Sequence, residues 1–193
     1  MTELTLSRRQ GSGFAVPLLI AVIVLAIAAA VIFEFNPHAT ADVAVTHTAV
    51  FASHFDLKGD TMLVNSDVAQ DDIYVLTTVR ITDQLRLPLF LKDFTATLTP
   101  TNPDGSAAAP ISTSAIEKPD LPNLYVTFPK LKAMVEEQAT EPLYRESQID
   151  PGKSATGIIL LHFPVTQQAW EHRKSAQLTI DLYHQQPITL PIP

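Results

Sequence analysis

The stretch DIYVLTTVRITD, residues 72–83, decides the fold, because it has the clearest two-residue alternation in the chain. Every second side chain from Ile73 to Ile81 is apolar, with Thr77 as the one polar member of the series. Successive side chains of a β-strand point to opposite faces, so this pattern is typical of a strand with one face against a core. Residues 72–83 therefore predict a β-strand with one apolar face.

Other stretches have the composition or the alternation of strands. They are residues 42–55, 89–99, 155–163 and 177–183. Residues 89–99 place Phe94 and Leu98 on one side, as a half-buried strand does. Residues 155–163 form a nearly continuous apolar run, which is typical of a buried strand. We expect residues 177–183 to close the domain.

Turn-forming residues separate these strands. Residues 102–105, Asn-Pro-Asp-Gly, and residues 150–153, Asp-Pro-Gly-Lys, combine residues that favour turns with a glycine that tolerates positive φ. Residues 106–123 are rich in alanine, serine and proline, and proline cannot donate a hydrogen bond within a sheet. They predict a long surface connection and not a central strand.

Two short helical segments are expected among the strands. Pro129 suits the first turn of a helix, and the residues after it place three apolar side chains on one face. We expect this helix to cover the sheet. Residues 166–174 predict a second helical turn, with Thr166 as its N-cap and Trp170 within it. Short antiparallel strands with few helices predict a mainly β fold, an immunoglobulin-like β-sandwich.

An uncharged apolar segment precedes this domain. The sequence of residues 14–33 is FAVPLLIAVIVLAIAAAVIF, and as a helix it would cover about 30 Å, the thickness of a bilayer core. Arg8 and Arg9 lie before it, which favours a cytosolic amino terminus. The segment therefore predicts a single-pass protein of the inner membrane, bound to the lipid bilayer through residues 14–33. The expected order is a cytosolic tail at 1–13, a transmembrane helix at 14–34, a linker at 35–42 and a periplasmic or extracellular domain at 43–193.

The amino-terminal segment also has features of a cleaved signal peptide and of a twin-arginine signal. Ala39-Thr40-Ala41 has the small-x-small pattern of a signal peptidase site, so cleavage after Ala41 would release a soluble domain. The apolar run is longer than that of most signal peptides, which favours an anchor. Arg8 and Arg9 also resemble a twin-arginine signal, but residues 11–13, Gly-Ser-Gly, stand where that signal is apolar.

Charge and cysteine content exclude several functions. Residues 1–34 hold two of the 20 acidic and two of the 13 basic side chains, so the net charge of −7 lies on residues 35–193. An acidic domain repels phosphate backbones and anionic lipid surfaces, so we expect no nucleic-acid partner. The chain has no cysteine, which excludes disulfides, thiolate metal ligands and thiol nucleophiles.

No motif assigns a catalytic or cofactor-binding residue. Gly152-Lys153-Ser154 resembles the end of a phosphate-binding loop, but Ser147 stands where the first glycine belongs and a strand follows. We expect a plain β-turn there. The exported part has no Gly-x-Ser-x-Gly elbow for a nucleophilic serine. The expected set of catalytic, cofactor-binding and metal-binding residues is therefore empty.

The titratable side chains are interpreted as ordinary surface groups. The histidines are His38, His47, His54, His162, His172 and His184. None has the spacing of a zinc motif, and His47 and His54 would face opposite sides of one strand. The neighbouring acids Asp67, Asp71 and Asp72 are expected to be solvated turn residues and not calcium ligands.

Two further groups of side chains have simple interpretations. The glutamates at 136, 137, 141 and 146 predict a solvated face. Trp170, Phe128 and Tyr125 are candidates for a binding patch, although a lone tryptophan in a sandwich is expected in the core. No metal is expected.

The order of these features resembles bacterial single-span proteins whose exported part is an immunoglobulin-like sandwich, similar to water-stress and late-embryogenesis-type domains. The likeness lies in the early strand at Ile73–Ile81, the turn at Asp150-Pro151-Gly152 and the apolar strand at Gly157–Phe163. It implies an interaction or protective module without catalytic residues. The chain also looks like the copper-delivering assembly factors of cytochrome oxidase, but these need a cysteine pair that it lacks.

The leading hypothesis is therefore a non-enzymatic, membrane-anchored envelope protein, an interaction or structural module that binds a protein or envelope partner through a sheet edge or a loop. An envelope hydrolase or accessory enzyme with a site assembled from distant residues is the alternative. A third hypothesis is an assembly factor for a membrane complex.

Overall fold

The computed structural model describes residues 15–35, 41–57, 68–85, 87–138 and 140–193. The chain forms two compact units, residues 1–38 and 39–193, and each is described by itself. The first unit holds α1 (Ala15–Phe35), in which the large apolar side chains described between Leu18 and Ile27 are exposed. Within the residues whose side chains are described, which in α1 are 17–30, no helical stretch is long and apolar enough to cross a bilayer. The predicted tail, 1–13, and most of the predicted linker lie outside the described residues.

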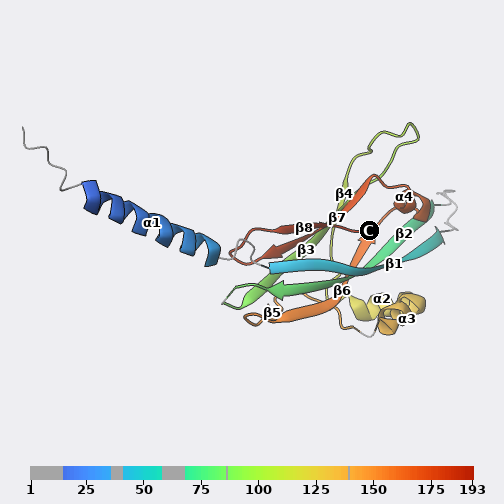
Figure 1. Ribbon diagram of the computed structural model, residues 1–193. Coiled ribbons are helices and arrows are strands. Elements are labelled where there is room, and N and C mark those ends of the chain that lie inside the picture. The colour runs from blue at the N-terminus through green and yellow to red at the C-terminus, as the bar shows by residue number, and fades with distance from the viewer. Residues whose placement is uncertain (1–14, 36–40, 58–67, 86, 139) are drawn as a thin grey trace, which may run out of the picture. The chain divides into compact units, whose positions relative to one another are not determined.

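Two antiparallel sheets form the second unit (Figure 1). The three-stranded sheet has the order β1 (Ala41–Leu57), β2 (Val68–Asp83) and β6 (Ser154–Phe163). The five-stranded sheet has the order β4 (Ile111–Ser114), β3 (Leu89–Thr99), β7 (Ser175–Leu182) and β8 (Ile188–Pro191), and β5 (Gln148–Ile149) pairs with β3. The mainly β, antiparallel fold is confirmed.

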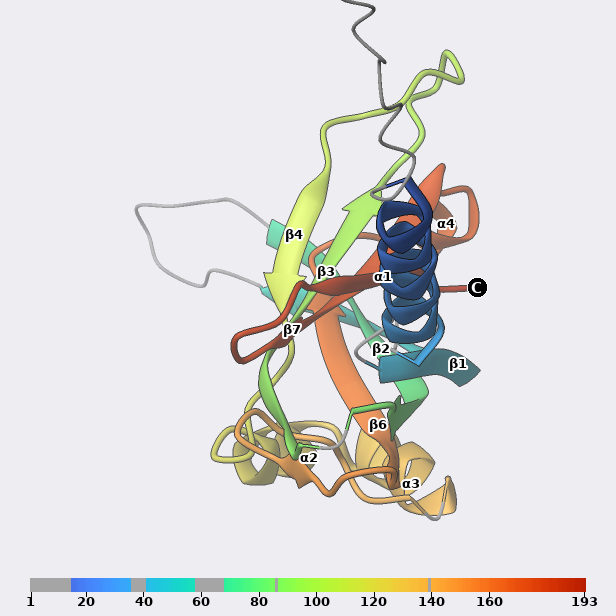
Figure 2. The ribbon, with the colours of Figure 1, turned by 60° about the vertical axis from the view of Figure 1, so that its left-hand side comes forward.

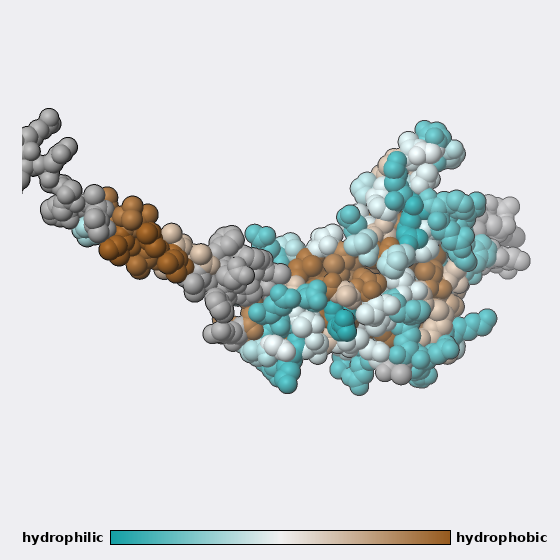
Figure 3. All heavy atoms as spheres, in the orientation of Figure 1, coloured by the Kyte–Doolittle hydropathy of each residue, from teal (hydrophilic) through white to brown (hydrophobic). Residues whose placement is uncertain are grey.

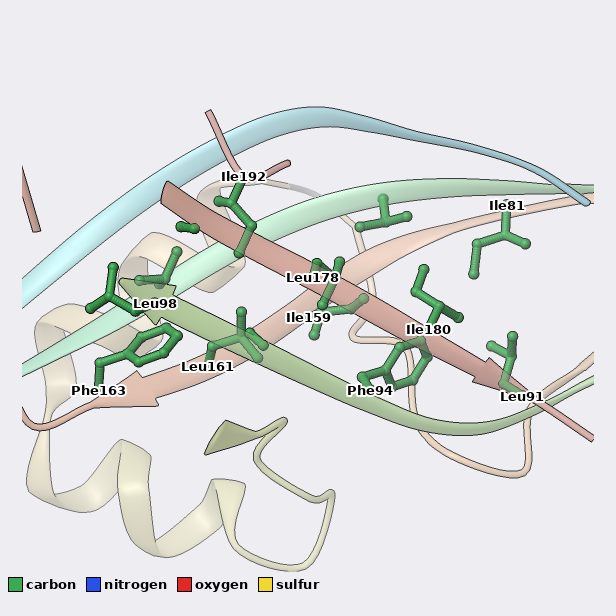
Figure 4. Close-up of a cluster of buried hydrophobic side chains, with 14 of the residues drawn as sticks. Ile81, Leu91, Phe94, Leu98, Ile159, Leu161, Phe163, Leu178, Ile180 and Ile192 are labelled. Atoms are coloured by element: carbon green, nitrogen blue, oxygen red, sulfur yellow. The ribbon is translucent and has the colours of Figure 1, made fainter. Parts of the chain in front are cut away.

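The two sheets enclose the main hydrophobic core. Figure 4 shows side chains from β2 and β6 meeting those from β3 and β7 between the sheets. The labelled residues are Ile81, Leu91, Phe94, Leu98, Ile159, Leu161, Phe163, Leu178, Ile180 and Ile192. The predicted apolar face of β2 is confirmed, because the alternating side chains from Ile73 to Ile81 are all fully buried, Thr77 included.

Two helices cover the outer face of the three-stranded sheet. They are α2 (Leu121–Thr127) and α3 (Pro129–Glu137), and both views place them on the side away from the second sheet (Figure 1, Figure 2). Leu131 of α3 is fully buried against Leu76 and Tyr74 of β2 in a second apolar cluster. The prediction of α3 as a cover is confirmed, but β2 is buried on both faces and not on one.

Two expectations about the chain order were wrong. Residues 106–123 are not one surface connection, because they contain the edge strand β4 and the start of α2. Residues 177–183 are not the last strand, because β8 follows. Pro191 lies in β8 at the border of the sheet, where a missing backbone donor breaks no ladder.

The predicted turns and the second helical segment are confirmed. Gly105 and Gly152 have φ of 81° and 68°, values that glycine adopts without strain. The helix α4 (Gln167–Glu171) is capped by Thr166, whose Oγ1 accepts a hydrogen bond of 3.1 Å from the backbone N–H of Ala169. Trp170 is 4% exposed, so it belongs to the core and not to a binding patch.

Gly157 in β6 lets a neighbouring segment approach the strand. A Cβ at this position would lie 2.5 Å from Cγ of Leu143 and 2.7 Å from the carbonyl oxygen of Glu141. Only glycine therefore allows residues 141–143 to lie against β6 without a shift of the backbone.

We predict that Gly157→Ala lowers the free energy of unfolding of residues 39–193 by about 1–3 kcal/mol, because the added methyl group overlaps packed atoms. Urea-induced unfolding followed by tryptophan fluorescence measures the change. Thr156→Ala, on the exposed side of the same strand, is the control and should shift stability by less than about 0.5 kcal/mol. Equal stability of both variants would refute the packing role of Gly157.

Candidate interaction surface

The three-stranded sheet has one open border, the outer edge of β1. This strand is 17 residues long, and among the described residues its backbone pairs with β2 alone. β8 is its neighbour across the border of the sandwich, but β8 pairs with β7. The outward backbone N–H and C=O groups of β1 between Thr48 and Ala52 therefore have no partner in the described part of the chain.

The opposite border of the same sheet, the outer edge of β6, is covered by other segments. The backbone N–H of Ile116 donates to Leu160 O at 2.8 Å, after an isolated bridge between Ala115 and Leu161.

A second segment covers the same border at Ile158. The N–H of Leu143 donates to Ile158 O at 2.9 Å, and the N–H of Ile158 donates to Glu141 O at 3.2 Å. The close approach at Gly157 makes this second cover possible. The border at β6 is thus covered at Ile158 and Leu160, whereas the outward groups of β1 from Thr48 to Ala52 have no partner among the described residues.

The direction of each backbone group on β1 follows from the ladder. The N–H of Asp83 donates to Lys153 O at 2.9 Å, next to the start of β6, so odd-numbered residues of β2 bond toward β6. Even-numbered residues of β2 then bond toward β1. Their partners on β1 alternate with residues whose N–H and C=O point outward. Thr48, Val50 and Ala52 are outward-pointing, since they pair with odd-numbered residues of β2.

β1 carries little of the protection that edge strands usually have. Its sequence, ADVAVTHTAVFASHFDL, contains no lysine, arginine or proline. The register shift between Val45 and His47 is its one bulge over the described pairing with β2. Natural edge strands avoid new pairing through such charges, prolines and bulges. A long strand with one bulge, and with acidic side chains only near its ends at Asp42 and Asp56, is a candidate surface for adding another strand.

An apolar strip lies beside this edge. Figure 3 shows apolar surface through the middle of the domain, where Figure 1 draws β1 and β8. The half-buried apolar side chains that these two strands pack against the core are Val43, Val45, Val50, Ile188 and Leu190. An added strand would cover part of this strip with its own apolar side chains.

A cavity of about 450 Å³ lies on the other face of the sheet, between β1 and α3. Its lining residues are His47, Ala49, Thr78, Met134, Glu137, Gln138 and Thr140. The hydroxyl of Thr78 donates to Oε1 of Gln138 at 2.7 Å, which ties the end of α3 to β2. Because β1 is the border strand, the cavity lies next to the open edge.

A second group of polar side chains surrounds His162 on the outer face of β6. Its Nε2 lies 3.0 Å from Oδ1 of Asp72, and Nε2 is buried without a hydrogen bond of good geometry. Asp72 is 6% exposed and accepts a hydrogen bond of 3.2 Å from Nε2 of Gln70. Burial, and secondarily the charge of Asp72, raise the pKa of Tyr74 above its ordinary value.

These contacts correct two interpretations. Asp72 is a buried residue within β2 and not a solvated turn acid. His162 is not an ordinary surface histidine, because its Nε2 is buried. His162 also borders a groove with Phe128 and Asp120 from the segment around α2.

The other predicted side chains are dispersed. His47 and His54 face opposite sides of β1 as expected, since His47 lies opposite Thr78 and His54 opposite Asp71, with His54 Nδ1 2.6 Å from Asp71 Oδ1. The glutamates 136, 137, 141 and 146 are exposed, as expected.

The candidate phosphate-binding turn and the candidate metal ligands do not form sites in the described part of the chain. The Gly152-Lys153 turn is followed by β6, so no helix amino terminus faces it. Within the described part of the chain, no cluster of three or more histidine, aspartate or glutamate residues could hold a metal ion. His38 and Asp67 lie outside the described residues.

Comparison with known proteins identifies no family. No protein-family model and no curated protein matches the sequence. A solved structure, that of a functionally unknown protein from Listeria monocytogenes EGD-e, aligns with a TM-score of 0.35 and 10% sequence identity. The alignment covers 79% of this chain and 87% of that one. Similarity at this level supports no inference about the fold or the function of this chain.

Proposed function

We propose that the chain is a non-catalytic interaction module, anchored in the inner membrane by residues 14–33, that binds an extended segment of a protein or envelope partner along β1. The observation that supports this proposal most directly is the difference between the two borders of one sheet. Residues 115–116 and 141–143 cover β6 at Ile158 and Leu160, whereas β1 is open from Thr48 to Ala52 among the described residues. Strand addition supplies affinity through main-chain hydrogen bonds. It requires an accessible edge of the kind that β1 has.

The order of the strands supports an immunoglobulin-like sandwich. β1, β2 and β6 would correspond to strands A, B and E, and β3, β7 and β8 to strands C, F and G. β4 extends the second sheet beside β3, where the constant-type domain instead has strand D on the first sheet. In this assignment β1 is strand A, the border strand of its sheet.

The properties of α1 support a membrane anchor. It is a helix of 21 residues, and at 1.5 Å per residue it would span about 30 Å. Its described apolar side chains are exposed, with Leu18 and Leu25 at 69% and 72%. A bilayer would remove this apolar surface from water. Residue 14 and the side chains of 15, 16 and 31–33 lie outside the described part of the chain.

The strongest candidate site for the alternative, an envelope hydrolase, is the pair of Asp72 and His162, of which His162 borders a groove. No further residue of that group is positioned as a nucleophile, so the interaction module remains the proposal.

We predict that Ala52→Pro abolishes partner binding while the domain stays folded. The outward N–H of Ala52 takes no part in the ladder with β2, so proline removes only a donor at the open edge. A photo-crosslinking residue at the exposed position Thr46 of the full chain in membranes would report the partner. The crosslinked band should be present in wild type and absent in Ala52→Pro.

The matched control is Ala52→Val, which keeps the backbone N–H and suits a strand. Circular dichroism would verify that both variants are folded. The same crosslinked band in wild type, Ala52→Val and Ala52→Pro would contradict binding along β1.

We also predict that the full chain stays in the membrane fraction after an alkaline carbonate wash, with its original amino terminus, because residues 14–33 span the bilayer. Amino-terminal sequencing and fractionation measure both points. The fragment 39–193 is the soluble control. A mature chain that begins at Asp42 and leaves the membrane would instead establish cleavage after Ala41.

A further inference from the structure

We propose that the segment added along β1 is basic, and that a lysine or arginine side chain from it binds in the cavity between β1 and α3 beside Glu137. This inference rests on the proposed strand addition and specifies the chemistry of the partner. In strand addition, pockets that receive alternate side chains supply specificity.

The position of the cavity suits a side chain of an added strand. His47 and Ala49 of β1 form one wall, and α3 forms the other. Neighbouring strands lie about 4.8 Å apart, and alternate side chains of an added strand would point to the same face as His47 and Ala49. A lysine or arginine is long enough to reach from the added strand across β1 into the cavity.

The electrostatics of the cavity favour a cation. Glu137 is exposed and makes no ion pair with a described residue, whereas its neighbour Glu136 pairs with Lys132 at 3.6 Å. Glu137 is also the last residue of α3, a helix of nine residues with no basic side chain in its last turn. The carboxyl end of a helix carries partial negative charge, so it adds to the attraction of the carboxylate.

The apolar parts of the cavity suit the stem of such a side chain. Met134 is half-buried, and Ala49 lies opposite it on β1. Lysine and arginine cover apolar surface with their methylene groups while the charged end stays near water or a counter-charge. Arg80, on the same face of β2 as Thr78, does not line the cavity.

The side chains of an added strand point alternately to its two faces, so the second face also defines the partner. The side chains on its other face would meet the apolar strip of Val43, Val45 and Val50 on β1. The partner segment therefore alternates basic with apolar residues. The net charge of −7 would attract such a segment over distance.

A second copy of the chain does not fit this surface. β1 contains no lysine or arginine, so pairing of two β1 strands would bring no cation to Glu137. The shared negative charge would also oppose the approach of two copies.

Short soluble peptides test the inference with the full chain in neutral detergent micelles. Three peptides of equal length alternate valine with lysine, with glutamine or with glutamate. The lysine peptide should bind most tightly, with an affinity that falls as salt is added, and the glutamate peptide should bind most weakly.

Variants of α3 locate the cation. Glu137→Gln should weaken the lysine peptide about five-fold and reduce its salt dependence, as the loss of one partly exposed charge pair does. Glu136→Gln, the matched control on the same helix, should change the affinity less than two-fold, which is about 0.4 kcal/mol. Binding of the glutamine peptide should be equal in all three proteins.

The outcomes separate this inference from the proposed function. Equal binding of the three peptides, with loss in Ala52→Pro, would retain strand addition and overturn the basic partner. Equal effects of Glu136→Gln and Glu137→Gln would overturn the cavity as the site. Binding of none of the peptides at about 1 mM, or self-association of the chain that Ala52→Pro abolishes, would overturn both.

Discussion

Every strand at the border of a sheet leaves one row of backbone N–H and C=O groups without a partner in that sheet, and a fold must either cover such a row or leave it available. The three-stranded sheet here does both. On β6, Ile158 and Leu160 are bonded by residues 116, 141 and 143. On β1, the outward groups from Thr48 to Ala52 have no partner among the described residues. The two borders of this sheet therefore differ, because the β6 border is covered and the β1 border can accept a further strand.

The helices are part of the same arrangement. α2 and α3 bury the outer face of β2, and the chain that leaves α3 then runs back along β6 as residues 141–143. Gly157 is the point at which this segment lies closest to β6. The helical cover therefore seals one border, while the end of α3 forms a cavity at the other. The proposed binding of a basic strand uses the open edge of β1 and the cavity between β1 and α3.

Local pattern predicted the elements whose signal lies within a few residues. The alternation from Ile73 to Ile81, the glycine turns and the cap at Thr166 are of this kind, and all are found. The strand β8 was missed because it has four residues and contains a proline. The second buried face of β2 was missed because Tyr74 and Leu76 share that face with Thr78 and Arg80, which look solvated, and because their cover comes from distant helices.

The candidate surface depends on contacts between distant residues, so most of it was not predictable. A sheet edge was proposed as the interaction surface, but the sequence did not indicate which edge would be open. One local signal existed: a glycine inside an apolar strand often marks close approach of another backbone, and Gly157 is such a residue. The burial of Asp72 beside His162 had no local signal, because the two residues belong to different strands.

Hydrogen exchange of the purified full chain tests the difference between the two borders most directly. We predict fast exchange of the outward amides of Thr48, Val50 and Ala52 on β1, because only water would accept their hydrogen bonds. The outward amide of Ile158 on β6, which donates to Glu141 O at 3.2 Å, should be protected. Equal, strong protection of both sets in the dilute, monomeric chain would mean that β1 is already covered, and would contradict strand addition along this edge.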